Sequence, residues 1–89
     1  MPTINGNLIL EKDTVFEEDL IVKGNIIGKN GMRYNLRVKG KIDCHNINCS
    51  NINASFILCE TLKQKEGSKL IAKNLIEHRS TYERKEIKR

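Results

Sequence analysis

The chain has no tryptophan, a single proline and only 4% aromatic residues. Aromatic side chains supply much of the buried area in many globular cores, so a core without them has to be narrow and aliphatic. No run of 18 apolar residues occurs, and Met1-Pro2-Thr3-Ile4 does not resemble a signal peptide. We therefore expect one small domain in the cytoplasm of a bacterium or a phage-infected host cell, without membrane contact and with its three cysteines reduced.

Repetition is the main feature that the sequence does contain. Large aliphatic residues recur every 16 residues, with a last step of 18, at Ile4, Leu20, Leu36, Ile52 and Leu70. A shorter period of five alternates the large residues Ile47, Ile52, Ile57 and Leu62 with the small residues Cys44, Cys49, Ala54 and Cys59. Neither a helix nor a free-standing strand has this spacing. It predicts short strands joined at corners, with three strands per coil and coils stacked at the parallel strand spacing.

Two segments match best, Leu20–Gly28 and Leu36–Cys44, and their alignment places Gly24 on Gly40 and Lys23 on Lys39. We expect these glycines to supply a positive φ at a repeated corner. Four asparagines flank the apolar positions of the five-residue period, and we expect them to form a hydrogen-bonded ladder at the corners: Asn46, Asn48, Asn51 and Asn53.

The predicted fold is all-β: a small parallel, right-handed, three-sided β-helix of about five coils over residues 1–76. A charged tail, helical or disordered, follows at residues 77–89. A solenoid leaves an open core at each end, which needs a cap or a second subunit. The apolar residues available for this at the C-terminal end are Leu75, Ile76, Tyr82 and Ile87.

The cysteines suggest packing more than chemistry. Cys44, Cys49 and Cys59 occupy small inward positions together with Ala54. The alternative is a zinc site that adds His45, but adjacent residues on a strand point to opposite faces, and no CxxC pair exists. Phosphate-binding glycine motifs and local nucleophile–base pairs are also lacking, so we expect no cofactor, no metal and no enzymatic activity.

Charge is distributed unevenly along the chain. Residues 1–22 contain Glu11, Asp13, Glu17, Glu18 and Asp19 with one lysine, whereas residues 23–41 contain six basic residues and no acid. Strand alternation and the 16-residue period predict one outward basic face from Lys23, Arg37, Lys39 and Lys41. This face is either a solvated surface that discourages sheet aggregation or a contact surface for an acidic partner. Because Tyr34 is the only aromatic residue in residues 23–41, nucleic acid is the weaker choice of partner.

The sequence resembles two known groups over residues 4–62. The Ile-x-Cys/Ala blocks of residues 44–62 look like pentapeptide-repeat proteins, with the large-to-small order offset from the usual motif. The segments Val22-Lys-Gly24-Asn-Ile26 and Val38-Lys-Gly40-Lys-Ile42 resemble bactofilins, which are β-helical scaffolds that polymerise end to end. The second resemblance implies a structural polymer that needs no nucleotide.

These observations favour a non-catalytic interaction or structural module that self-associates, with a protein partner and a homodimer as the expected assembly. One alternative is a small inhibitor, of phage origin, that binds a host nucleic-acid-processing complex through the basic face. The other is a bactofilin-like polymer-forming scaffold.

Overall fold

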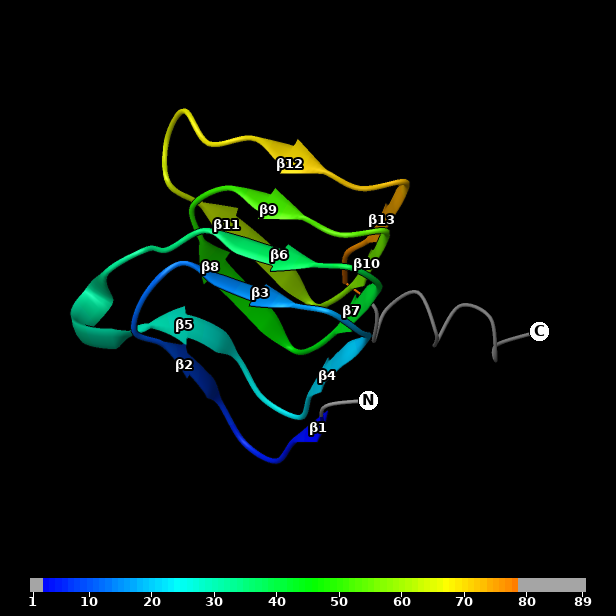
Figure 1. Cartoon of the computed structure of the whole chain (residues 1–89), viewed down its shortest axis with the longest axis horizontal. Helices are drawn as coiled ribbons and strands as arrows, with labels where there is room; N and C mark the ends of the chain where they lie inside the picture. The colour runs from blue at the N-terminus through cyan, green and yellow to red at the C-terminus, as the bar shows by residue number, and fades with distance from the viewer. Residues whose placement is uncertain (1–2, 79–89) are drawn as a thin grey trace.

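The computed structural model describes residues 3–78 and shows a parallel β-solenoid, as the spacing predicts (Figure 1). Short strands follow one another around the tube: β1 (Thr3–Ile4), β2 (Leu8–Leu10), β3 (Thr14–Phe16), β4 (Leu20–Val22), β5 (Ile26–Gly28), β6 (Leu36–Val38), β7 (Lys41–Asp43), β8 (Asn46–Cys49), β9 (Ile52–Asn53), β10 (Phe56–Leu58), β11 (Thr61–Gln64), β12 (Leu70–Ile71) and β13 (Asn74–Ile76). A 3-10 turn, η1 (Lys29–Gly31), lies between β5 and β6.

The strands form three parallel sheets, one for each side of the tube. The first sheet has the order β1-β4-β7-β10-β13, the second β11-β8-β5-β2 and the third β12-β9-β6-β3. The described chain therefore makes about four turns, four complete ones and one strand of a fifth, where the sequence suggested about five coils.

The core is aliphatic and runs along the axis of the tube. Its buried members are Leu10, Leu20, Val22, Ile26, Leu36, Val38, Ile42, Cys44, Ile47, Cys49, Ile52, Ala54, Ile57 and Cys59. The five-residue period is thus confirmed: each side of the third turn contributes one large residue from a strand and one small residue next to a corner. In the first two turns the corresponding positions hold larger side chains, such as Leu10, Phe16 and Val38.

The alignment of the long period is right for its last two steps and wrong for its first two, since Ile4 pairs with Val22. Leu36 pairs with Ile52, and Ile52 pairs with Leu70, as predicted. Leu20, however, pairs with Ile42 and not with Leu36, because β4 belongs to the first sheet and β6 to the third. The η1 loop lengthens the second turn and thereby shifts the register (Figure 1). The two matching segments are therefore the same strand–corner–strand unit placed on different sides of the tube.

Gly24 and Gly40 serve close approach and not a positive φ. A Cβ on Gly24 would collide with the side-chain oxygen of Asn7, and a Cβ on Gly40 would collide with that of Asp19. The glycines with positive φ are Gly6, Gly31 and Gly67, in other turns. The predicted role of Gly24 and Gly40 was wrong because a side chain from the preceding turn, not a left-handed backbone, excludes larger residues.

Candidate binding face on the third sheet

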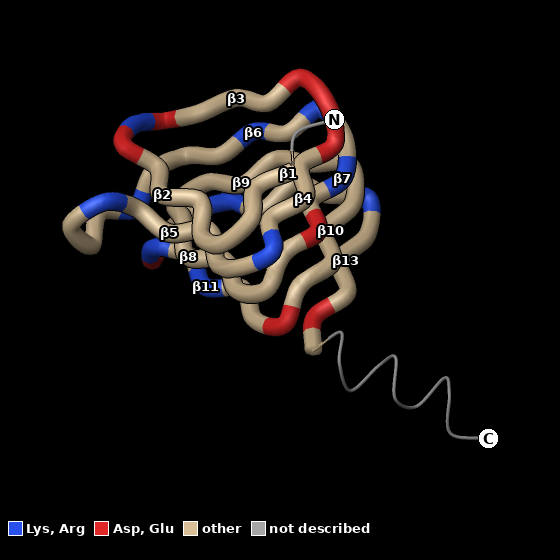
Figure 2. Tube along the Cα trace, turned by 90° about the horizontal axis from the view of Figure 1, so that it is seen from below, with Lys and Arg blue, Asp and Glu red and all other residues tan. Residues whose placement is uncertain are grey.

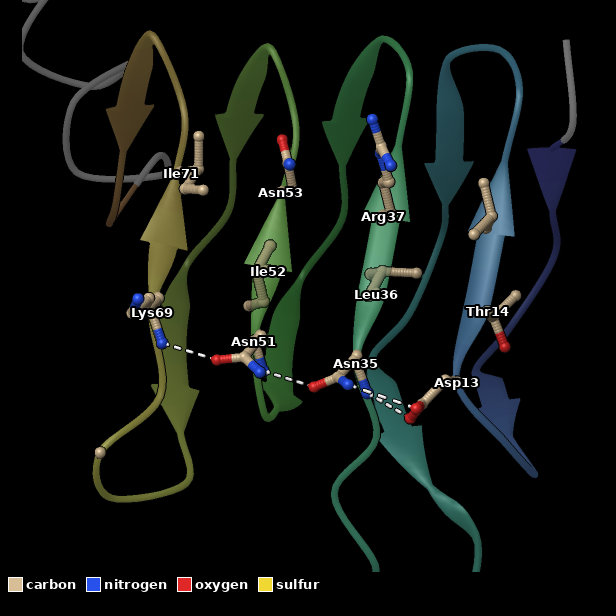
Figure 3. A pocket seen from close by; sticks show the side chains of 12 residues that line it. Asp13, Thr14, Asn35, Leu36, Arg37, Asn51, Ile52, Asn53, Lys69 and Ile71 are labelled. Atoms are coloured by element: carbon tan, nitrogen blue, oxygen red, sulfur yellow. Dashed lines mark hydrogen bonds between the residues drawn. The ribbon is translucent and has the colours of Figure 1, made fainter.

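The outer face of the third sheet carries one side chain per turn in register. Val15 pairs with Arg37, Arg37 with Asn53, and Asn53 with Ile71. Their neighbours Leu36 and Ile52 point into the core, so strand alternation turns these side chains outward. Figure 3 shows Arg37, Asn53 and Ile71 in one row on neighbouring strands. We call Val15, Arg37, Asn53 and Ile71 the central row.

A groove runs along this face. Its volume is about 600 Å³, and its lining includes all four central-row residues together with Asp13 and Lys69. A second hollow of about 390 Å³ adjoins it, lined by Lys39, Ser55 and Lys73 besides Arg37, Asn53 and Ile71. The third sheet therefore presents a hollowed surface across all its strands.

One edge of the groove is a ladder of side-chain to backbone hydrogen bonds (Figure 3). The N–H of Asn35 donates to Asp13 Oδ1 at 2.9 Å, the N–H of Asn51 donates to Asn35 Oδ1 at 3.0 Å, and the N–H of Lys69 donates to Asn51 Oδ1 at 2.8 Å. The amide of Asn35 also donates to Asp13 Oδ2. Each turn thus fixes the next along the groove, which holds the central row at the regular strand spacing.

A second ladder lies at the corner between the first and second sheets. The N–H of Asn25 donates to Asn7 Oδ1 at 2.8 Å, and the N–H of Asn46 donates to Asn25 Oδ1 at 3.2 Å. The hydroxyl of Thr61 then donates to Asn46 Oδ1 at 2.7 Å. The predicted asparagine ladder is therefore correct for Asn46 and Asn51. Asn48 and Asn53 lie on outer strand faces instead.

The cations of the third sheet differ in their pairing. Lys39 Nζ lies 2.9 Å from Glu17 Oε1, and both side chains are exposed. Within residues 3–78, the side chains of Arg37, Lys69 and Lys73 have no ion-pair partner. The acids of the first turn lie on both sides of β3 (Figure 2). Negative charge therefore lies at the N-terminal end of the groove, and unpaired positive charge lies along the rest.

The structure divides the predicted basic face. Arg37 and Lys39 share the third sheet, as expected. Lys41 lies on β7, beside Phe56, on the outer side of the first sheet. Lys23 follows β4 at another corner, so the prediction that it lies beside Lys39 is wrong. The backbone N–H of Lys23 donates a hydrogen bond to the carbonyl of Ile4 in the first turn.

Sequence reasoning missed two cations of this face, Lys69 and Lys73. The signal was present, because the step from Ile52 to Leu70 also places Ile71 on Asn53. The same register pairs Lys73 with Ser55, and the N–H of Lys73 donates to the carbonyl of Ser55 at 2.9 Å. The basic surface thus extends into the fourth turn.

The predicted cap residues fall into three groups. Leu75 pairs with Ile57 and packs partly buried against the core. Ile76 pairs with Leu58, so alternation turns it to the outer side of the first sheet, away from the open core. Tyr82 and Ile87 lie outside the described residues, as does most of the predicted tail at residues 77–89.

The cysteines occupy the core, as predicted. Cys44, Cys49 and Cys59 are buried, and His45 points to solvent. Burial raises the pKa of Cys49 to about 11, and burial with the nearby carboxylates Glu77 and Glu60 raises the pKa of Cys59 to about 11. Such thiols remain protonated at neutral pH and are weak nucleophiles. Residues 3–78 contain no group of His, Cys, Asp and Glu side chains arranged to hold a metal ion.

Comparison with known proteins found no matching family, no matching curated protein and no matching solved structure. Among residues 3–78, no helix has the length and apolar character needed to cross a membrane.

Proposed function

We propose that the protein is a non-catalytic interaction module, a β-solenoid that self-associates through its coil ends. The observation that carries this proposal is the difference between paired positions inside and at the end of the tube. Leu70 stacks on Ile52 in the same sheet, yet Leu70 is 36% exposed and Ile52 only 1%. Among the described residues, no further turn covers Leu70.

The opposite end is open in the same way. Ile4, Leu8 and Phe16 belong to the first turn and are only partly buried against the core. The strands β1, β2 and β3 each have a strand neighbour on one side only within the described chain. Their free backbone groups and apolar side chains are what strand addition from another chain requires.

The symmetry of the contact decides the assembly. Like ends that meet across a two-fold axis close into a dimer, whereas unlike ends that meet head to tail leave free ends and produce a filament. The dimer corresponds to the leading expectation from sequence, and the filament to the bactofilin-like alternative.

Sedimentation velocity of the full chain over a range of protein concentrations tests self-association. We expect a mass above that of the monomer, lowered by Leu70→Asp, which places a charge at the end of the core. Ile9→Asp is the matched control, because Ile9 is exposed on the outer side of the second sheet. A wild-type chain that stays monomeric at all concentrations contradicts the proposal. Ile4→Asp separates the assemblies: it cuts filaments but leaves a dimer built from C-terminal ends intact.

A second candidate function is binding of an acidic partner, which includes the inhibitor alternative. The unpaired cations Arg37, Lys69 and Lys73 on one hollowed face favour it. The relevant set differs from the predicted one, since Lys23 and Lys41 lie elsewhere.

Binding to labelled polyglutamate at several salt concentrations tests this candidate. We expect the double variant Arg37→Glu, Lys73→Glu to weaken binding and its salt dependence, because surface cations attract acidic partners over a Debye length of roughly 10 Å at 0.1 M salt. The control pair Lys23→Glu, Lys63→Glu changes the net charge equally on other faces. Equal loss in both pairs means that net charge, and not this face, attracts the polymer.

A further inference from the structure

We propose that the third-sheet groove binds an extended peptide segment of a partner protein with the pattern apolar-x-acidic-x-apolar. This inference rests on the second candidate function and names the class of its ligand. It depends on the order of side-chain types along the central row, which is apolar at Val15, polar at Arg37 and Asn53, and apolar again at Ile71.

The two ends of the row are exposed apolar anchors. Val15 is 54% exposed and Ile71 is 57% exposed, although both lie in the groove lining. Exposed large apolar side chains at both ends of one groove provide contact area for apolar side chains of a ligand. Ile71 also lines the second hollow, so a ligand side chain can contact it from either hollow, whereas Val15 lines only the groove.

The spacing fits an extended peptide that crosses the strands. Neighbouring strands lie roughly 4.8 Å apart, so the three steps from Val15 to Ile71 span about 14 Å. An extended chain advances about 3.4 Å per residue, so side chains i and i+4 on one face also lie about 14 Å apart. Side chain i+2 then falls midway, between Arg37 and Asn53.

The chemistry at the midpoint fits a carboxylate. Arg37 has no ion-pair partner within residues 3–78, and its planar guanidinium can donate two parallel hydrogen bonds to a carboxylate. The Asn53 side chain lies beside it on the next strand and offers an amide donor. A glutamate or aspartate at i+2 therefore meets donors from two strands.

The flanking charges orient the ligand. Lys69 and Lys73 lie on either side of Ile71 in the fourth turn, whereas Asp13 and Glu17 lie on either side of Val15 in the first. The peptide end that carries further acids therefore belongs at Ile71, and a basic residue belongs at Val15. A nucleic acid fits less well, because its phosphates would meet Asp13 and its bases would find no aromatic side chain in the lining of either hollow.

Fluorescence anisotropy with the labelled heptapeptide KLSESLE tests the inference on the full chain. The control is LLKSEES, which has the same composition but adjacent apolar residues that cannot reach both anchors. We expect at least about tenfold tighter binding of KLSESLE, corresponding to a loss of about 1.4 kcal/mol for the control. Arg37→Glu, Val15→Ser and Ile71→Ser should each remove this preference, while Ile9→Ser on the second sheet should not. Circular dichroism confirms that each variant is folded.

Equal binding of the two peptides, or a preference that survives both Val15→Ser and Ile71→Ser, overturns the inference. If polyglutamate still binds through Arg37 and Lys73, the second candidate function stands and only the peptide pattern fails. If an oligonucleotide displaces KLSESLE from the wild type and binds more tightly than it, the ligand class is nucleic acid and the inference is wrong. Self-association is measured separately and does not depend on any of these outcomes.

Discussion

The side chain of Asp19 lies against the bare Cα of Gly40, and its Oδ1 accepts the N–H of Lys41 at 2.8 Å. Asn7 makes the same arrangement with Gly24, since its Oδ1 accepts the N–H of Asn25 at 2.8 Å. In both places a side-chain oxygen of one turn satisfies a backbone donor at the corner of the next turn. Glycine is required because a Cβ would occupy the position of that oxygen.

Removal of the Asp19 oxygen should destabilise the corner between the third and first sheets. Asp19→Ala leaves the partly buried N–H of Lys41 without its acceptor, and we expect a loss of about 1.5 kcal/mol, typical of a hydrogen bond to a charged group. Urea denaturation measures the difference. Asp19→Asn keeps an acceptor of the same shape and should recover most of the loss. Equal losses in the two variants would show that the carboxylate acts only through its charge.

Burial of a charge at Ile52 should prevent folding. Ile52 is 1% exposed between Leu36 and Leu70, so Ile52→Asp is expected to cost at least several kcal/mol, which is comparable to the whole stability of a small domain. Asn53→Asp is the matched control on the outer face, where the new carboxylate lies beside Arg37. Thermal melts followed by circular dichroism compare the two. A variant at Ile52 that melts like the variant at Asn53 contradicts the register.

Loss of the Asn51 side chain should loosen the turn before β12. Its Oδ1 accepts the N–H of Lys69, and Asn51→Ala removes that acceptor. We expect amide hydrogen exchange at Lys69 to rise about fivefold, which corresponds to the roughly 1 kcal/mol of one hydrogen bond. Asn53→Ala serves as the comparison, because the Asn53 side chain makes no hydrogen bond within residues 3–78. Unchanged exchange at Lys69 would mean that the ladder does not hold this turn.

The buried thiols should make stability fall in alkaline solution. The folded chain holds the proton of Cys49 up to a pKa of about 11, compared with an ordinary value of 9.0, so folding is favoured most while the thiol is protonated. The contribution is fully present below pH 9 and is lost as the pH rises from about 9 to about 11. Cys59 acts in the same direction.

Melting temperatures measured across this pH range check the alkaline loss. The double variant Cys49→Ala, Cys59→Ala should show a flatter dependence between pH 9 and 11. At neutral pH, Cys49→Ala alone should remain folded at a cost of about 1 kcal/mol, because it removes one buried sulfur. An identical pH dependence in wild type and double variant would assign the alkaline loss to other groups.

Much of the solenoid was predictable because its core pattern is local. Each side of the third turn has one large and one small inward residue, so the five-residue period from Cys44 to Cys59 indicated both the short strands and the corners. The positions of Asn46 and Asn51 in corner ladders followed from the same period.

The register of the first two turns was not predictable in this way. The three sides use the same kind of strand–corner–strand unit, so the similarity of Leu20–Gly28 to Leu36–Cys44 does not reveal which side each occupies. The η1 loop adds residues to the second turn without changing the inward pattern. The 16-residue period therefore misplaces Lys23, whereas Lys41 leaves the basic face because the corner at Gly40 carries the chain from the third sheet to the first.

The sequence by itself determined that this chain forms a narrow parallel solenoid with cysteines in its core, since both follow from which residues must point inward at each corner. Only the tertiary structure decided which outward residues become neighbours. Val15, Arg37, Asn53 and Ile71 are 22, 16 and 18 residues apart along the chain, and they form one row because the loops between turns have different lengths. Loop length carries no hydrophobic signal, so the binding face depends on information that a periodic pattern does not contain.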